Sequence, residues 1–195
     1  MHSVDPRFLQ LVQQIGAIGI QGANSYNAAQ AELKLDTVLS QASLATAAGT
    51  HESLKTLNRL SQLNVAHKKM FATFMTTAVS QLSAVLAELP EEHAADLRDG
   101  MVSSINWNLK AQSEFYVNRD KWIEAASTIC LLVERHRASI AFSEEGISFD
   151  RKKTLQRFTD LVSIADEIHV LEVKQTAERM SRLSASMAVF SSIPK

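Results

Sequence analysis

This chain of 195 residues is almost without cysteine, since Cys130 is the only one. A single cysteine cannot form a disulfide within the chain, so we expect a fold that does not depend on an oxidising compartment. The first residues, MHSVDPRFLQLVQQIG, lack the basic stretch and long apolar run of a secretory signal peptide. The longest apolar runs also fall short of the roughly 18 residues that a membrane-spanning helix needs. We therefore expect a soluble cytoplasmic protein with no transmembrane segment, while secretion by a route without a readable signal stays open.

An excess of charge of either sign is also missing. The chain has 20 Lys and Arg against 21 Asp and Glu, a formal net charge of -1. Nucleic acids and anionic membranes both require a concentrated positive field. We therefore expect no nucleic-acid partner.

Glycine and proline are scarce, with 6 and 3 copies, and alternating runs of β-branched residues are missing. Such a chain has few places to turn and little sequence typical of strands. Hydrophobic residues make up 46% and charged residues 21%, the balance of a globular protein. The composition predicts an all-α fold with one sizeable core.

The few helix-breaking residues gather where helix ends are expected. Asp5 followed by Pro6 is typical of an N-cap and a first helical residue. The stretch SEEGISFD at 143–150 predicts a loop, with Asp150 capping the next helix. The remaining predicted boundaries are 22–25, 48–50, 89–92 and 99–100.

Long segments remain between these boundaries. Three of them, 50–89, 101–142 and 151–193, predict helices of about 40 residues, each roughly 60 Å long. Residues 25–48 give a shorter fourth helix, and 6–20 a short extra N-terminal helix. Because short connections make neighbouring helices antiparallel, the sequence predicts an elongated antiparallel four-helix bundle. We expect a single domain over 1–195, with an N-terminal arm at 1–22 and the bundle at 25–195.

Apolar residues recur every three or four positions along each long helix. In 50–89 this stripe repeats every eleven residues, which predicts coiled-coil-like packing of nearly straight helices. The expected inward residues there are Leu60, Leu63, His67, Phe71, Phe74, Ala78, Leu82, Val85 and Leu89. In 101–142 they are Val102, Ile105, Leu109, Tyr116, Ile123, Ala126, Cys130, Val133 and Ile140. In 151–193 they are Leu155, Phe158, Val162, Ala165, Met180, Leu183, Met187 and Phe190.

Three glycines follow one another at intervals of three, at Gly16, Gly19 and Gly22. A dinucleotide-binding loop needs a different spacing and a preceding strand, so this function is excluded. Each glycine costs roughly 1 kcal/mol in a helix interior relative to alanine. We therefore favour a helix that ends or kinks between Gly16 and Gly22. The alternatives are a bare strip where another helix packs closely, and a hinge.

Catalytic and metal-binding patterns are missing from the sequence. It has no Glu-x-x-His pair for a di-iron bundle, no His-Glu-x-x-His zinc helix and no G-x-S-x-G turn. Cys130 lies on an apolar stripe, where cysteine behaves as a small hydrophobic residue. We therefore expect no enzyme activity, no cofactor and no metal.

One polar and aromatic stretch, SINWNLKAQSEFYVNRDKWIEAA, interrupts the stripe of 101–142. Three interpretations are open: an ordinary core segment with its arginine paired to a carboxylate, a partner-binding patch, and a pocket for a small anion. The candidate binding residues are Trp107, Gln112, Tyr116, Arg119 and Trp122.

These observations favour a non-enzymatic helical-bundle protein that binds a protein partner, or itself, along a helical face. The alternative is a bundle that binds a small anionic metabolite through Gln112, Tyr116 and Arg119. A helical enzyme with an unfamiliar site, and a lipid-inserting bundle that uses residues 8–20, are the remaining hypotheses.

Overall fold

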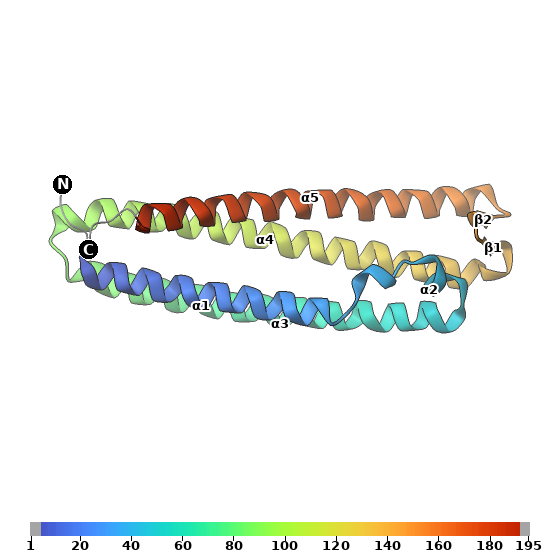
Figure 1. Cartoon of the computed structure of the whole chain (residues 1–195), viewed down its shortest axis with the longest axis horizontal. Coiled ribbons are helices and arrows are strands. Elements are labelled where there is room, and N and C mark those ends of the chain that lie inside the picture. The colour runs from blue at the N-terminus through green and yellow to red at the C-terminus, as the bar shows by residue number, and fades with distance from the viewer. Residues whose placement is uncertain (1–4, 192–195) are drawn as a thin grey trace. The chain divides into compact units, whose positions relative to one another are not determined.

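The computed structural model describes residues 5–191, with side chains throughout this range except at 180 and 183–191. Its elements in chain order are α1 (Pro6–Ala31), η1 (Leu35–Thr37), α2 (Gln41–Ala45), α3 (Ala47–Ala87), α4 (Glu91–His136), η2 (Arg137–Ser139), β1 (Ile140–Ser143), β2 (Gly146–Phe149) and α5 (Lys152–Ser191) (Figure 1). The all-α class is confirmed. The count of four bundle helices is not confirmed, since the described residues form five α-helices and a two-stranded hairpin.

Contacts within the chain group the described residues into two compact units. The first unit holds 5–35 and 58–113, and the second holds 36–57 and 114–191. Helices α3 and α4 each contribute to both units, because the unit boundaries fall inside these helices. The single domain expected over 1–195 stays a prediction.

In the first unit, α1 begins as the sequence predicts. The carboxylate of Asp5 accepts a hydrogen bond from the backbone N–H of Arg7 at 2.7 Å, and Pro6 is the first helical residue. The Nη1 of Arg7 also donates to Oε2 of Glu88 at 2.8 Å, which links the start of α1 to the end of α3. The two helices therefore run antiparallel, as Figure 1 shows.

Helix α1 is continuous through its three glycines, so the break predicted between Gly16 and Gly22 is wrong. A Cβ at Gly19 would lie 3.4 Å from the ring of Phe74, and one at Gly22 would lie 3.4 Å from the Met70 methyl group. A Cβ at Gly16 would meet nothing within 4 Å. Packing against α3 stabilises the helix despite its glycines, because tertiary contacts outweigh helix propensity. The close-packing alternative holds for two of the three glycines, although side chains approach them.

The core of the first unit joins α1, α3 and the first turns of α4. Phe8, Leu82 and Leu86 are buried at its centre, and burying each such side chain is worth about 1.5–3 kcal/mol. Partly buried neighbours pack around them: Leu11, Val12, Ile15, Val85, Leu89, Leu97 and Met101.

Helix α4 begins at the boundary predicted for 89–92, directly after Pro90. It then continues through Gly100, so the boundary predicted at 99–100 is wrong. A Cβ at Gly100 would meet nothing within 4 Å. One glycine costs only about 1 kcal/mol in a helix interior, which a helix of 46 residues tolerates.

Residues 25–48 do not form the expected fourth helix. The end of α1, η1 and the short α2 share this stretch. Side chains create the breaks: Ser40 Oγ accepts from the N–H of Ser43 to cap α2, and Thr46 Oγ1 accepts from the N–H of Gly49 at the start of α3. The helix boundary predicted at 48–50 therefore falls at Thr46.

The side chain of Arg137 holds the segments of the second unit together. Its Nη1 donates to the carbonyl oxygen of Leu44 and its Nη2 to Oγ1 of Thr50, both at 2.9 Å. The most deeply buried residues of the second unit include Leu44, Ile129, Cys130 and Val133.

The loop predicted at 143–150 is wrong in part, because β1 and β2 pair as an antiparallel hairpin. The register joins Ile140 to Phe149 and Ser143 to Gly146. Gly146 has a φ of +134°, which favours glycine. The ring of Phe149 lies 5.0 Å from that of Phe158, which packs the hairpin against the first turns of α5.

Candidate interaction surfaces

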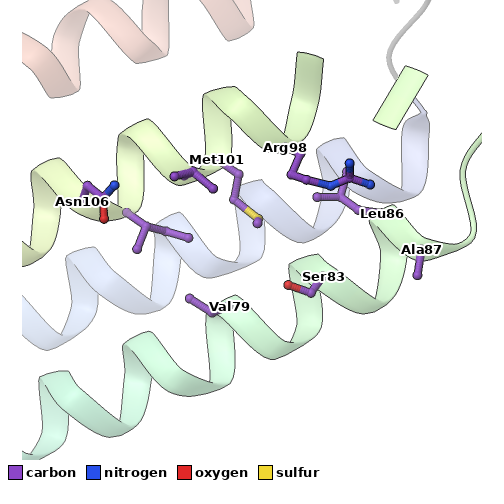
Figure 2. A pocket seen from close by; sticks show the side chains of 9 residues that line it. Val79, Ser83, Leu86, Ala87, Arg98, Met101 and Asn106 are labelled. Atoms are coloured by element: carbon purple, nitrogen blue, oxygen red, sulfur yellow. The ribbon is translucent and has the colours of Figure 1, made fainter. Parts of the chain in front are cut away.

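A groove runs between α3 and α4 in the first unit, with a volume of about 440 Å³. Figure 2 shows residues of α3 and α4 that line the groove, with Arg98 beside Leu86 at one end and Asn106 at the other. The wall from α3 consists of Val79, Ser83, Leu86 and Ala87. The wall from α4 consists of Arg98, Met101, Val102, Ile105 and Asn106. We call these nine residues the α3–α4 groove.

The chemistry of the α3–α4 groove is mainly apolar. Arg98 is its one charged residue, and Nη1 of Arg98 lies 3.1 Å from Oε1 of Glu91. The hydrogen bond between them raises the pKa of Arg98 and lowers the pKa of Glu91. The lining therefore offers an apolar surface with one cation at its end, and no acid–base pair that could catalyse a reaction.

Two residues of α4 that were expected in the core are exposed in the structure. Val102 and Leu109 were expected to face inward, yet they are 47% and 44% exposed. Leu155 of α5, also expected inward, is 42% exposed. The apolar residues of α4 do share one face, but in the first unit Val102 and Ile105 of this face line the open groove. Of the inward residues expected in α5, those at 180, 183, 187 and 190 lie outside the described side chains.

The five candidate binding residues are divided between the two units. Trp107 and Gln112 belong to the first unit and are half-buried. Tyr116, Arg119 and Trp122 belong to the second, where the first two are buried and Trp122 is half-buried. All five stay candidates, and none of them lines the α3–α4 groove.

In the second unit, Arg119 forms a buried ion pair between α4 and α5. Its Nη2 lies 3.0 Å from Oε2 of Glu172, and the two side chains are 11% and 13% exposed. The Nε of Arg119 and Oε1 of Glu172 are also buried, and neither has a hydrogen-bond partner among the described residues. Breaking such a pair leaves an uncompensated charge, which costs about 3–5 kcal/mol.

Further polar contacts surround this ion pair. The guanidinium carbons of Arg119 and Arg179 each lie 5.5 Å from the centre of the Phe115 ring. Gln175 bridges the helices, because it accepts from Asn118 and donates to Glu114, each at 3.3 Å. We call this set the α4–α5 polar cluster: Glu114, Phe115, Asn118, Arg119, Glu172, Gln175 and Arg179.

Burial dominates the ionisation of this cluster. It raises the pKa of Glu172, although the nearby charges of Arg119, His169 and Arg179 oppose the shift. It also lowers the pKa of Arg179, against the attraction of Tyr116, Glu114 and Glu172. Sequence reasoning singled out Arg119 but did not pair it with Glu172, and it missed Arg179. The available signal was their spacing of seven, with Gln175 between them, which places all three on one face of α5.

Nothing in the described part of the chain gathers three or more His, Cys, Asp or Glu side chains around a possible metal ion. Cys130 is fully buried, as its apolar stripe predicts. Desolvation raises the pKa of its thiol to about 11. A thiol in this environment is a poor nucleophile.

Among the described residues, one helix could cross a membrane by length and composition. An 18-residue window of α3 has a mean hydropathy of 1.4, and 22% of it is buried. Core helices of water-soluble proteins meet the same criterion, so the finding is weak evidence for a span.

Comparison with protein-family models, curated proteins and solved structures finds no match for this chain.

Proposed function

We propose that this chain is a non-enzymatic interaction protein that binds a helix of a partner protein in the α3–α4 groove. The observation that supports the proposal is the groove itself, an open apolar channel with Val102 47% exposed on one wall. Apolar grooves between helices are typical sites where an amphipathic helix of a partner protein binds.

The spacing of the lining favours a helix as the occupant. Residues recur every three or four positions on both walls, at 79, 83 and 86 on α3 and at 98, 102 and 105 on α4. Such rows form ridges with grooves between them, which accept the side-chain ridges of another helix. Since the first unit contains α1 and parts of α3 and α4, a docked helix would complete a four-helix bundle.

Charge determines the chemistry of the partner helix. Arg98 is the single cation at one end of the groove, and only Ser83 and Asn106 are otherwise polar. The expected partner has apolar residues along one face and a carboxylate near the end that meets Arg98. A charge-assisted hydrogen bond to Arg98 would fix its direction.

Photo-crosslinking from inside the groove tests this proposal. A photoreactive amino acid at Val102 should give an adduct of defined mass, whose mapped peptide is an apolar helix with an acidic residue. The same amino acid at Leu131, which is 51% exposed on α4, is the control position. Val79→Asp places a charge on the opposite wall, and burying it unpaired should reduce the Val102 adduct about ten-fold.

Two results would contradict the proposal. Equal adducts from Val102 and Leu131 would show that the groove is not selective. An adduct that Val79→Asp leaves unchanged, in a variant with unaltered circular dichroism, would place the partner elsewhere.

The alternative function, binding of a small anion at Arg119, has one observation in its favour: the Nε of Arg119 is buried without a partner in the described residues. We favour it less, because the Arg119–Glu172 pair is buried, at 11% and 13% exposed, so an anion would have to enter between α4 and α5 and displace Glu172 there. Native mass spectrometry separates the two functions. A small extra mass that Arg119→Ala removes would support the anion, and a co-purified polypeptide would support the groove.

A further inference from the structure

Helix α1 has an unusually uncharged surface. Between Arg7 and Glu32 lie 24 consecutive residues without one charged side chain, where typical composition would give about six. One face of this stretch packs on α3, where Phe8 and Tyr26 are buried. The opposite face of α1, which we call the outer face, is exposed although it carries no charged side chain between Arg7 and Glu32.

The outer face of α1 carries a seven-residue repeat. Seven exposed residues, four amides and three alanines, follow one another at alternating spacings of four and three: Gln10, Gln14, Ala17, Gln21, Asn24, Ala28 and Ala31. Residues with this spacing form the seam of a coiled coil, where apolar residues are usual and a polar residue fixes the register at a cost in stability. The repeat differs from the apolar face of the same helix, so it is not a continuation of the core. We call these seven residues the α1 seam.

The seam also has a hollow. Ala17, Ile20, Gln21, Asn24, Ser25 and Ala28 line a shallow depression on the surface of α1. Ile20 at its edge is 44% exposed, and Ile18 on the other flank is 57% exposed. Small alanines between longer amides let a second helix approach closely and insert its own side chains.

The amide side chains of the α1 seam indicate which kind of molecule would cover it. An amide both donates and accepts hydrogen bonds, so one amide face satisfies an identical face. A lipid or a purely apolar helix would bury the amides unsatisfied, at about 1–3 kcal/mol for each group. A strongly charged partner would find no opposite charge on the seam. We infer that the α1 seam pairs with the α1 seam of a second copy of this chain, giving a two-fold dimer.

Gln21 lies at the centre of this pairing. In a parallel dimer every seam residue meets its own copy. In an antiparallel dimer the order reverses, and one register places Gln14 opposite Ala31, Ala17 opposite Ala28 and Gln21 opposite Asn24. Amide pairs at such positions specify register and the number of helices.

Sedimentation velocity over a range of concentrations tests the inference. The unmodified chain should form a dimer. Ala17→Glu should shift it to monomer, because pairing would then bury an unpaired charge in the seam. Ala23→Glu makes the same change at an exposed position of α1 away from the seam and should leave the dimer intact. Circular dichroism confirms that both variants stay helical.

Disulfide crosslinking gives a second readout. Gln21→Cys should form a covalent dimer on mild oxidation, whereas Ala23→Cys, away from the seam, should not. The buried Cys130 does not interfere, since its thiol is inaccessible. Val79→Asp, on the α3–α4 groove, should not affect either readout, so failure here is separate from failure of the proposed function. A monomer at every concentration, or a dimer that survives Ala17→Glu, would overturn the inference.

Discussion

Gly49 is the glycine of this chain whose replacement would place a Cβ against the backbone of another segment. A Cβ at this position would lie 2.2 Å from the backbone oxygen of Ser43, because α2 crosses close to the first turn of α3. The obstacle is backbone and cannot rotate away. Gly49→Ala should therefore destabilise the protein by about 1–3 kcal/mol, despite the better helix propensity of alanine. Urea denaturation followed by circular dichroism measures this change.

Gly16→Ala is the matched control for that substitution. It adds the same methyl group inside a helix, but at a place where nothing lies within 4 Å. We expect it to stabilise the protein by up to about 1 kcal/mol through helix propensity alone. If Gly49→Ala also stabilised the protein, the close approach of α2 to α3 would be wrong.

Cys130 provides a further prediction at the scale of one residue. With its pKa raised to about 11 by burial, about one thiol in a thousand is ionised at pH 8. A thiol-specific disulfide reagent should therefore react very slowly with the native protein and rapidly in denaturant. Rapid reaction of the folded chain would show that the core around Cys130 opens readily.

At the scale of elements, local signals in the sequence predicted helix ends well and helix continuity poorly. The starts of α1 and α4 depend on Asp5–Pro6 and on Pro90, whose effects are confined to a few residues. The continuity of α1 through Gly16, Gly19 and Gly22 depends instead on α3, some 50 residues further along the chain. The hairpin did have a local signal, because Ile140, Phe142, Ile147 and Phe149 alternate around Gly146.

The α3–α4 groove could be predicted only in part. Val102 and Ile105 were recognised as one apolar face, but a stripe does not state what covers it. The same limit applies to Arg119. Its inward position follows from helical spacing, whereas its partner Glu172 lies on a different helix, and pairing between helices has no local signature.

Glu172 gives a pH-dependent prediction for the pair of helices α4 and α5. Burial raises its folded-state pKa above the ordinary value of 4.5, so folding favours the protonated form. The stabilising contribution is complete below pH 4.5 and is lost as the pH rises through the folded-state pKa. The free energy of unfolding of the native chain, relative to Glu172→Gln, should therefore fall as the pH rises above about 4.5.

Urea denaturation at several pH values measures this difference. Glu167→Gln is the matched control, because Glu167 is an exposed carboxylate on the same helix. A difference that rises with pH would contradict the prediction. It would mean that attraction to Arg119 outweighs the cost of burying the charge.

At the scale of the whole molecule, the two units share helices. The boundaries at 57–58 and 113–114 fall inside α3 and α4, which are continuous there. Unfolding one unit alone would end two helices in mid-course and leave up to four backbone groups unsatisfied at each new end. This cost favours unfolding of both units together, as expected for the single domain predicted over 1–195.

The two tryptophans can test whether the units unfold together, because Trp107 lies in the first unit and Trp122 in the second. Trp122→Phe leaves a fluorescence signal from the first unit, and Trp107→Phe leaves one from the second. Each variant should show the same urea midpoint by fluorescence and by circular dichroism, since coincident transitions indicate two-state unfolding. A fluorescence midpoint separate from the circular dichroism midpoint in either variant would instead show that the continuous helices can break at the unit boundaries, and that the chain consists of two independently folding parts.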